Sequence, residues 1–89
     1  MDVEVRKVSE TELEDLGVKE WPIWEKGESS FDWHYDDKET CYFLEGEVEV
    51  EHSDGKKAKI VKGDLAVFPK GLGCKWNIKK KVRKHYKFG

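Results

Sequence analysis

The chain has 89 residues, 37% of them hydrophobic and 40% charged, with a formal net charge of −2 at pH 7. A chain of this length builds one hydrophobic core, so we expect a single domain over residues 1–89, and its hydrophobic content argues against disorder. No apolar run is long enough for a signal sequence or a membrane span, so we expect a cytoplasmic protein that does not act at membranes.

Charge is unevenly distributed along the sequence. Residues 1–51 hold 17 acidic and 5 basic side chains, whereas residues 52–89 hold 2 acidic and 12 basic ones, so the two halves should attract each other. The basic half contains the run Lys79, Lys80, Lys81, Arg83 and Lys84. Val82, Tyr86 and Phe88 interrupt this run at strand spacing, and the twelve Glu would repel phosphate. We therefore predict a solvated strand face and no nucleic-acid partner.

Lys and Glu dominate the charged residues, and Gln is absent from the sequence. This composition is typical of heat-adapted proteins, and it predicts a thermophilic source.

The first elements are a strand and a short helix. Residues 3–8 alternate well enough for a strand. Ser9, followed three residues later by Glu12, has the spacing of a capping box, and Gly17 is suited to end a helix in the left-handed conformation. We expect a helix of about two turns between them.

From residue 18 onward the pattern is that of short antiparallel strands separated by turn residues. Pro22 places residues 18–24 at a sheet edge, and Asp54-Gly55 predicts a hairpin turn. In residues 47–52 the valines alternate with glutamates, which indicates one buried and one solvated face. The remaining expected strands are residues 31–35, 39–44, 58–61, 65–68, 74–78 and 82–88.

Two glycine-bearing segments carry a family resemblance. Residues 63–71 follow the pattern of the second cupin motif: glycine, five residues, proline, any residue, glycine. Glu39 with Gly46 behind it is similar to the end of the first cupin motif. Over residues 31–86 the chain resembles the small cupins grouped with ureidoglycine aminohydrolase-like and ethanolamine-utilisation cupin proteins. The resemblance implies an all-β, conical, jelly-roll-like barrel (a double-stranded β-helix) with an internal ligand pocket, and a homodimer.

The resemblance also implies where a metal would be held. In metal-binding cupins, three histidines and a glutamate are the ligands, and these positions correspond here to Trp33, Tyr35, Glu39 and Cys74. Only the glutamate is kept, so we expect no metal and no other cofactor. A one-residue shift would bring in His34 and Asp32 instead, but strand alternation would then turn Trp33 and Tyr35 outward, so we expect His34 at the surface.

A zinc site is the remaining metal alternative, with Glu39, Cys41 and Cys74 as ligands and Tyr35 as a poor fourth one. The competing interpretation is that the two cysteines are reduced and pack as small hydrophobic residues.

The expected pocket has its own chemistry without a metal. Glu39 is a candidate general acid or base, Tyr35 a hydrogen-bond donor to a carbonyl or oxyanion, and Cys74 a candidate nucleophile. The expected pocket walls are Trp33, Cys41, Phe43 and Trp76. Such aromatic walls around Glu39 would also suit a small cation.

Three functions follow from this sequence-based site. The first is an enzyme that acts on a small polar metabolite, such as a ureide, amine or carboxylate, by acid–base chemistry. The second is a non-catalytic binding or sensor protein that uses the same pocket. The third is a homodimeric interaction module that pairs through an exposed strand edge.

Overall fold

The structure is a computed structural model that describes residues 2–89, and most of the chain is in β-strands. Its elements are, in chain order, β1 (Glu4–Lys7), α1 (Glu10–Leu16), a 3₁₀ helix (Val18–Glu20), β2 (Ile23–Lys26), β3 (Ser29–His34), β4 (Glu39–His52), β5 (Lys57–Val61), β6 (Asp64–Phe68) and β7 (Gly73–Phe88). The expected all-β fold with one short N-terminal helix is confirmed.

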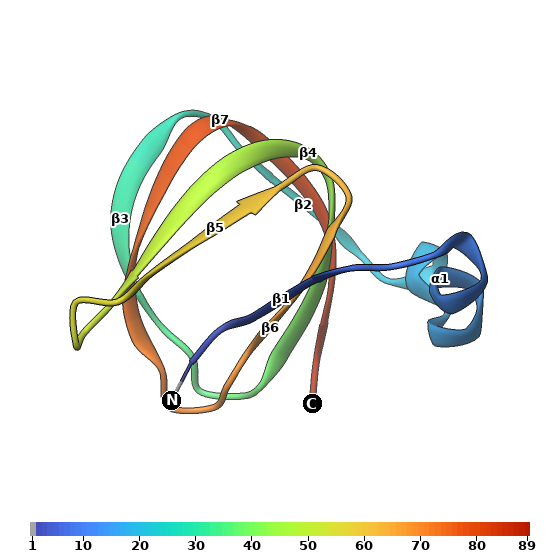
Figure 1. Ribbon diagram of the computed structural model, residues 1–89, viewed down its shortest axis with the longest axis horizontal. Helices are drawn as coiled ribbons and strands as arrows, with labels where there is room; N and C mark the ends of the chain where they lie inside the picture. Colours follow the sequence, from blue (N-terminus) through green and yellow to red (C-terminus); the bar gives the residue numbers. More distant parts are fainter. Residues whose placement is uncertain (1) are drawn as a thin grey trace.

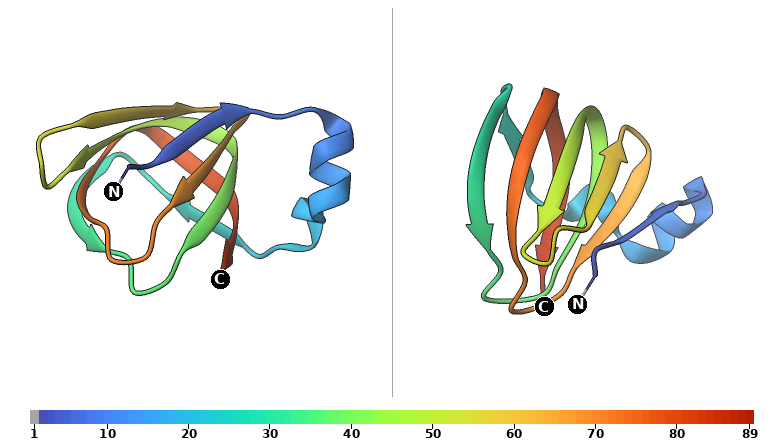
Figure 2. Two further views of the ribbon diagram at one scale, coloured as in Figure 1. Left: turned by 60° about the horizontal axis from the view of Figure 1, so that its bottom comes forward. Right: turned by 60° about the vertical axis from the view of Figure 1, so that its left-hand side comes forward.

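The strands form an antiparallel sheet that curves into a barrel (Figure 1). Its two longest strands, β4 and β7, pair with each other in the middle of the sheet. One half of the barrel has the order β1-β6-β4-β7-β2. In the other half, β5 pairs with β4 and β3 pairs with β7. Helix α1 projects from the side of the barrel (Figure 2). The interior is filled by a cluster of buried side chains from β4, β6 and β7 that includes Phe43, Val48, Val50, Phe68 and Trp76.

Strand β4 is longer than the sequence predicted, because residues 39–44 and 47–52 are one continuous strand rather than two. Its pairing with β7 shifts register between Phe43 and Val48, around Gly46. Gly46 has a φ of 111°, and a β-carbon there would lie 2.6 Å from the backbone oxygen of Lys81. The glycine therefore allows the two strands to cross closely without interrupting β4. Strand β7 likewise joins two predicted strands, residues 74–78 and 82–88.

The N-terminal helix has the expected caps. The Ser9 hydroxyl accepts a hydrogen bond from the Glu12 backbone N–H at 3.2 Å, and Gly17 ends the helix with a φ of 70°. In a full capping box, the Glu12 carboxylate would accept a hydrogen bond from the Ser9 backbone N–H. Here it pairs with Arg6 on β1 instead. No helix within residues 2–89 is long and apolar enough to cross a membrane.

The prediction of a strand over residues 18–24 is wrong in its first part. Residues Val18–Glu20 form a 3₁₀ helix that follows Gly17, and Val18 is buried. Pro22 lacks a backbone N–H, and β2 begins directly after it. The expected edge position is confirmed, because β2 is the last strand of its sheet path.

On the outer face of the barrel, strands from the acidic and basic halves of the sequence lie side by side. Strand β4 carries the outward glutamates and lies between β5 and β7, which carry lysines. Glu51 thus lies opposite Lys57 on one side and Lys75 on the other. Acidic and basic halves of the chain therefore interleave as neighbouring strands, and the expected attraction between them has a structural basis.

The prediction of a solvated strand face holds for most of the basic run and fails at one residue. Lys79, Lys80, Lys81 and Arg83 are exposed. Lys84 is only 5% exposed, because strand alternation places it on the inner face with Val82 and Tyr86.

Candidate functional site

A cavity of about 550 Å³ lies inside the barrel, and we call it the barrel pocket. Its walls come from β2, β3, β7 and the segment that leads into β4. The lining residues are Trp24, Lys26, Phe31, Asp32, Trp33, Tyr35, Glu39, Trp76, Lys84, Tyr86 and Phe88. A concave, mostly aromatic cavity with a few converging polar groups has the composition of a small-molecule site.

An ion pair between Glu39 and Lys84 is the most polar feature of this pocket. Glu39 is the first residue of β4, and Lys84 lies on the neighbouring strand β7. Lys84 Nζ donates a hydrogen bond to Glu39 Oε2 at 2.7 Å, and both residues are 5% exposed. Such a charge-assisted bond is strong, but it offsets a large loss of hydration for both groups.

Aromatic rings surround the ammonium group of Lys84. Its Nζ lies 4.7 Å from the ring centroid of Trp76 and 5.0 Å from that of Trp24. The rings of Phe43 and Phe68 lie at 5.8 Å. Ring faces attract positive charge, so they stabilise the ammonium form. The sequence suggested an aromatic cage for a small cation beside Glu39, and the structure fills that cage with the side chain of Lys84.

Tyr35 is positioned by the loop of the second glycine-bearing motif. Its backbone N–H donates to Leu72 O at 2.9 Å, and the Gly71 N–H donates to Tyr35 O at 2.7 Å. Gly71 has a φ of 88°, which favours glycine at that position. This motif therefore fixes a residue of the barrel pocket although it contributes no side chain to the lining.

The hydroxyl of Tyr35 can donate a hydrogen bond to a ligand in the pocket. It accepts a hydrogen bond from Trp76 Nε1 at 3.2 Å, which leaves its own proton for another partner. Burial raises the pKa of Tyr35 well above its usual range. The hydroxyl therefore stays protonated at neutral pH.

The structure brings four of the seven predicted site residues into the barrel pocket: Trp33, Tyr35, Glu39 and Trp76. Trp33 lies at the rim, with 49% of the residue exposed and its ring edge-to-face with Tyr35 at 6.5 Å.

Cys41 and Phe43, predicted as pocket walls, are fully buried in the core and do not line the pocket. They lie further along β4, where the barrel is filled. Burial raises the pKa of the Cys41 thiol to about 12.

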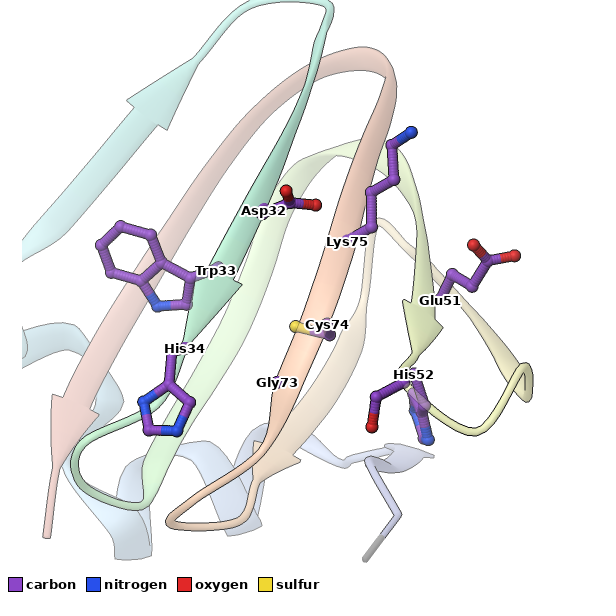
Figure 3. Close-up of a pocket in the computed structure, with 9 residues that line it drawn as sticks. Asp32, Trp33, His34, Glu51, His52, Gly73, Cys74 and Lys75 are labelled. Atoms are coloured by element: carbon purple, nitrogen blue, oxygen red, sulfur yellow. The ribbon is translucent and has the colours of Figure 1, made fainter.

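Cys74 lines a different hollow, of about 590 Å³, over the adjoining ends of β3, β7 and β4 (Figure 3). There Trp33, Cys74 and His52 form one row across the three strands. Burial raises the pKa of Cys74 to about 11, so it is a thiol at neutral pH. Cys74 belongs to the same core cluster as Tyr35 but does not line the barrel pocket, and the structure gives it no thiolate character.

The residues at the cupin ligand positions do not fit a metal ion. Trp33 and Tyr35 replace two histidines, and the remaining carboxylate, Glu39, already pairs with Lys84. Lys84 Nζ also lies 3.9 Å from Cys41 Sγ, so an ammonium lies where the zinc alternative needs a cation. Within residues 2–89, no group of three or more His, Cys, Asp or Glu side chains could hold a metal ion.

His34, the other histidine that the sequence raised, is at the surface as expected. Its side chain is 63% exposed and lies 3.2 Å from Asp36.

Sequence reasoning missed Lys84, which it had assigned to the solvent face. The sequence contains a usable signal, because Val82, Tyr86 and Phe88 recur at strand spacing and Lys84 has the same parity. Trp24 was also not predicted as a pocket residue, because residues 18–24 were expected to form a single edge strand.

A small antiparallel β-barrel with an internal pocket, built around these two glycine-bearing motifs, defines the cupin class of proteins. Residues 13–86 match the EutQ-like cupin domain, and the chain belongs to that family. No curated protein matches the chain.

Three solved structures show the same fold. A DUF861 family protein from Thermotoga maritima is 55% identical, with a TM-score of 0.98, and the match covers 99% of this chain and 100% of that one. The EutQ protein of Clostridium difficile is 27% identical (TM-score 0.68), over 74% of this chain and 52% of that one. A DUF861 family protein from Pseudomonas syringae is 24% identical (TM-score 0.69), over 75% and 29%. This chain thus spans about half of the EutQ protein.

Proposed function

We propose that this protein binds a small polar metabolite in the barrel pocket and acts on it by acid–base chemistry through Glu39, Lys84 and Tyr35. The observation that carries the proposal is the 2.7 Å pair of Glu39 and Lys84 in the lining of an aromatic cavity. A buried ion pair is a weak source of stability compared with apolar residues of the same size. Paired titratable groups in a cavity are a common feature of functional sites.

The free hydrogen-bonding groups favour a ligand with an acceptor atom. The Lys84 ammonium and the Tyr35 hydroxyl both donate, and together they suit a carboxylate or the carbonyl of a ureide. An amine would have to displace Lys84 from Glu39, so we favour these two classes over amines. The flat walls formed by Trp24, Phe31 and Tyr86 suit a planar or apolar body.

These groups divide the proposed chemistry between them. Glu39 exchanges a proton with the ligand, and the adjacent Lys84 keeps the local charge balanced while it does so. Lys84 and Tyr35 donate hydrogen bonds to negative charge that develops on the ligand oxygen. The aromatic walls exclude water and strengthen both interactions.

A panel of small carboxylates and ureides tests this function. Binding to the folded state raises the free energy of unfolding by about 2.7 kcal/mol at a ligand concentration of 100 Kd, and the melting temperature rises with it. It should also change the fluorescence of Trp24, Trp33 and Trp76 in the pocket. Glu39→Gln should lower the melting temperature, because Lys84 loses its charge partner, but the variant should still fold and should show weaker binding or turnover. The matched control is Glu51→Gln, which removes a carboxylate from the other hollow.

The outcomes separate the alternatives. Turnover of a bound compound, followed by NMR, supports an enzyme, and binding without turnover supports a sensor or carrier. Absence of any binding, or a Glu39→Gln variant that melts lower but binds with unchanged affinity, would overturn the proposed site.

A homodimer formed through sheet extension is a second proposal. The sheet path ends on β1 and β2, and Ile23 of β2 is 42% exposed. Unpaired strand edges are commonly covered. Sedimentation at micromolar concentration should show a dimer, and a monomer would remove the interaction-module alternative.

The thermophilic source also stays a prediction, and a melting temperature in the ordinary mesophilic range of about 45–65 °C would contradict it.

A further inference from the structure

Lys84 differs from every other lysine of residues 2–89, because it alone is buried. It also lines a cavity, pairs with a carboxylate and is surrounded by rings. Such enclosure strengthens a hydrogen-bonding anchor, and it also meets the requirement of a nucleophilic amine, since a lysine reacts only after it has lost its proton, which a water-poor site favours.

We propose that Lys84 is a covalent site, whose Nζ forms an imine with a small aldehyde or ketone bound in the barrel pocket. This inference rests on the proposed function, because it uses the same pocket, and it narrows the ligand class to carbonyl compounds. Each step has a group in place to perform it.

The first step is loss of a proton from the ammonium group. Glu39 Oε2 accepts a hydrogen bond from Lys84 Nζ at 2.7 Å, so the proton can pass directly between them. The transfer converts two buried charges into two neutral groups, which lose less hydration than ions do in an apolar environment. It leaves a lone pair on Nζ of a side chain that lines the cavity.

Addition and dehydration then follow. The Nζ lone pair bonds to the carbonyl carbon, and the carbonyl π pair moves to oxygen, which takes a proton from Tyr35 or from Glu39. The nitrogen, now positively charged, returns one proton to whichever of these two groups has given one up. Its freed lone pair then expels the oxygen as water, which leaves with a second proton from the same pair of groups. Overall, an ammonium and a carbonyl compound give an iminium and one water, so net charge is conserved. The carboxylate of Glu39 and the hydroxyl of Tyr35 are regenerated.

The aromatic cage suits the product as well as the resting state. An iminium on Lys84 is again a cation, and it would remain beside Trp76 and Trp24, whose centroids lie within 5.0 Å of Nζ. The rings therefore stabilise positive charge before and after the reaction.

The cavity favours a carbonyl compound with a flat body and an acidic end. Phe31 and Tyr86 offer flat surfaces, and a second lysine, Lys26, lines the same cavity with its Nζ 5.4 Å from the Phe31 ring. Lys26 gives the cavity a second positive charge, which suits a ligand that carries a carboxylate. The inferred class is therefore aromatic or branched 2-oxo acids and related aldehydes.

Reductive trapping tests the inference. The protein is incubated with phenylpyruvate and sodium cyanoborohydride, digested and mapped by mass spectrometry. The peptide that contains Lys84 should gain the mass of phenylpyruvic acid less one oxygen atom. Phenyllactate, which has a hydroxyl in place of the carbonyl, is the matched ligand, and it should raise the melting temperature without labelling any lysine.

Two variants locate the reaction. Lys84→Arg keeps the charge but lacks a nucleophilic amine, so the label should be lost. Lys87→Arg changes an exposed lysine on the same strand, and its label should equal that of the natural chain. If Lys84→Arg does not fold, the position of the label in the natural chain still decides the matter.

The possible results distinguish the two proposals. Binding of both compounds with no label on Lys84, or with label spread evenly over surface lysines, overturns the imine and leaves the binding function standing. Failure of both compounds and of the wider panel to bind overturns the proposed function as well.

Discussion

Glutamate and lysine pair in two regions of this molecule, and the regions differ in exposure. Inside the barrel, Glu39 and Lys84 lie 2.7 Å apart with side chains 6% exposed. On the outer face, Lys57 lies 3.7 Å from Glu49 and 3.8 Å from Glu51, and these side chains are 36–56% exposed. The same two residue types thus occupy a nearly dry site and a wet one.

The difference shows that burial, more than pairing itself, decides what an ion pair does. Exposed pairs gain little, because water screens the charges and the long side chains lose freedom. A buried pair is bound tightly but has given up its hydration, so each partner depends on the other. The outer pairs are therefore expected to be replaceable one by one, and the inner pair only together.

The alternation of side chains along β4 determines whether each of its glutamates lies inside the barrel or on its outer face. Before the register shifts, the odd residues Glu39, Cys41 and Phe43 point inward, and after them the even residues Val48 and Val50 do so. The irregularity near Gly46 thus reverses the alternation within a single strand.

Removing one partner of the inner pair should have the largest effect. Lys84→Met leaves Glu39 as an unpaired carboxylate in the barrel, and we expect the free energy of unfolding to fall by about 3–5 kcal/mol. Urea denaturation measures it. The Glu39→Leu/Lys84→Met double variant removes both charges and should recover much of that loss. A double variant as unstable as the sum of the two single variants would contradict the interdependence of the pair.

The strand irregularity can be tested at its glycine. Gly46→Ala places a β-carbon 2.6 Å from Lys81 O at a φ of 111°, so we expect a loss of about 1–3 kcal/mol. Gly27→Ala is the matched control, because its added β-carbon meets nothing within 4 Å. Equal thermal stability of the two variants would show that β4 can cross β7 without a glycine.

Alkaline pH tests how apolar the inner region is. Cys41 lies 3.9 Å from Lys84, and burial raises its pKa from about 9 to about 12. Below pH 9 the thiol is protonated in both the folded and the unfolded chain. Above pH 9 only the unfolded chain loses the proton, so stability should fall by roughly 1 kcal/mol per pH unit up to pH 12. Melting curves from pH 7 to 11 should show a shallower fall in Cys41→Ala, and equal slopes would place Cys41 in a polar site.

The sequence was sufficient for the barrel and insufficient for the pairing inside it. Glycine spacing and alternation predicted the strands, the helix caps and the inward side of residues 39–43 and 48–50, because these depend on local geometry. The joining of residues 39–52 into one strand depends on how closely β7 approaches at Gly46. The partner of Glu39 lies 45 positions away. Alternation alone could have placed Lys84 inside, but only contact between β4 and β7 identifies Glu39 as its partner.

The outer pairs should show the smallest effect of all. Lys57→Gln removes the cation that lies near both Glu49 and Glu51, yet all three side chains keep access to water and the remaining charges stay hydrated. We expect a change within about 0.5 kcal/mol, and one that shrinks further as salt is raised, because screening already weakens these contacts. Urea denaturation at low and high ionic strength measures both effects, with Lys84→Gln as the inner counterpart. A loss for Lys57→Gln as large as that for Lys84→Gln would mean that the Glu–Lys ladder acts as a network, and that exposure does not separate the two regions.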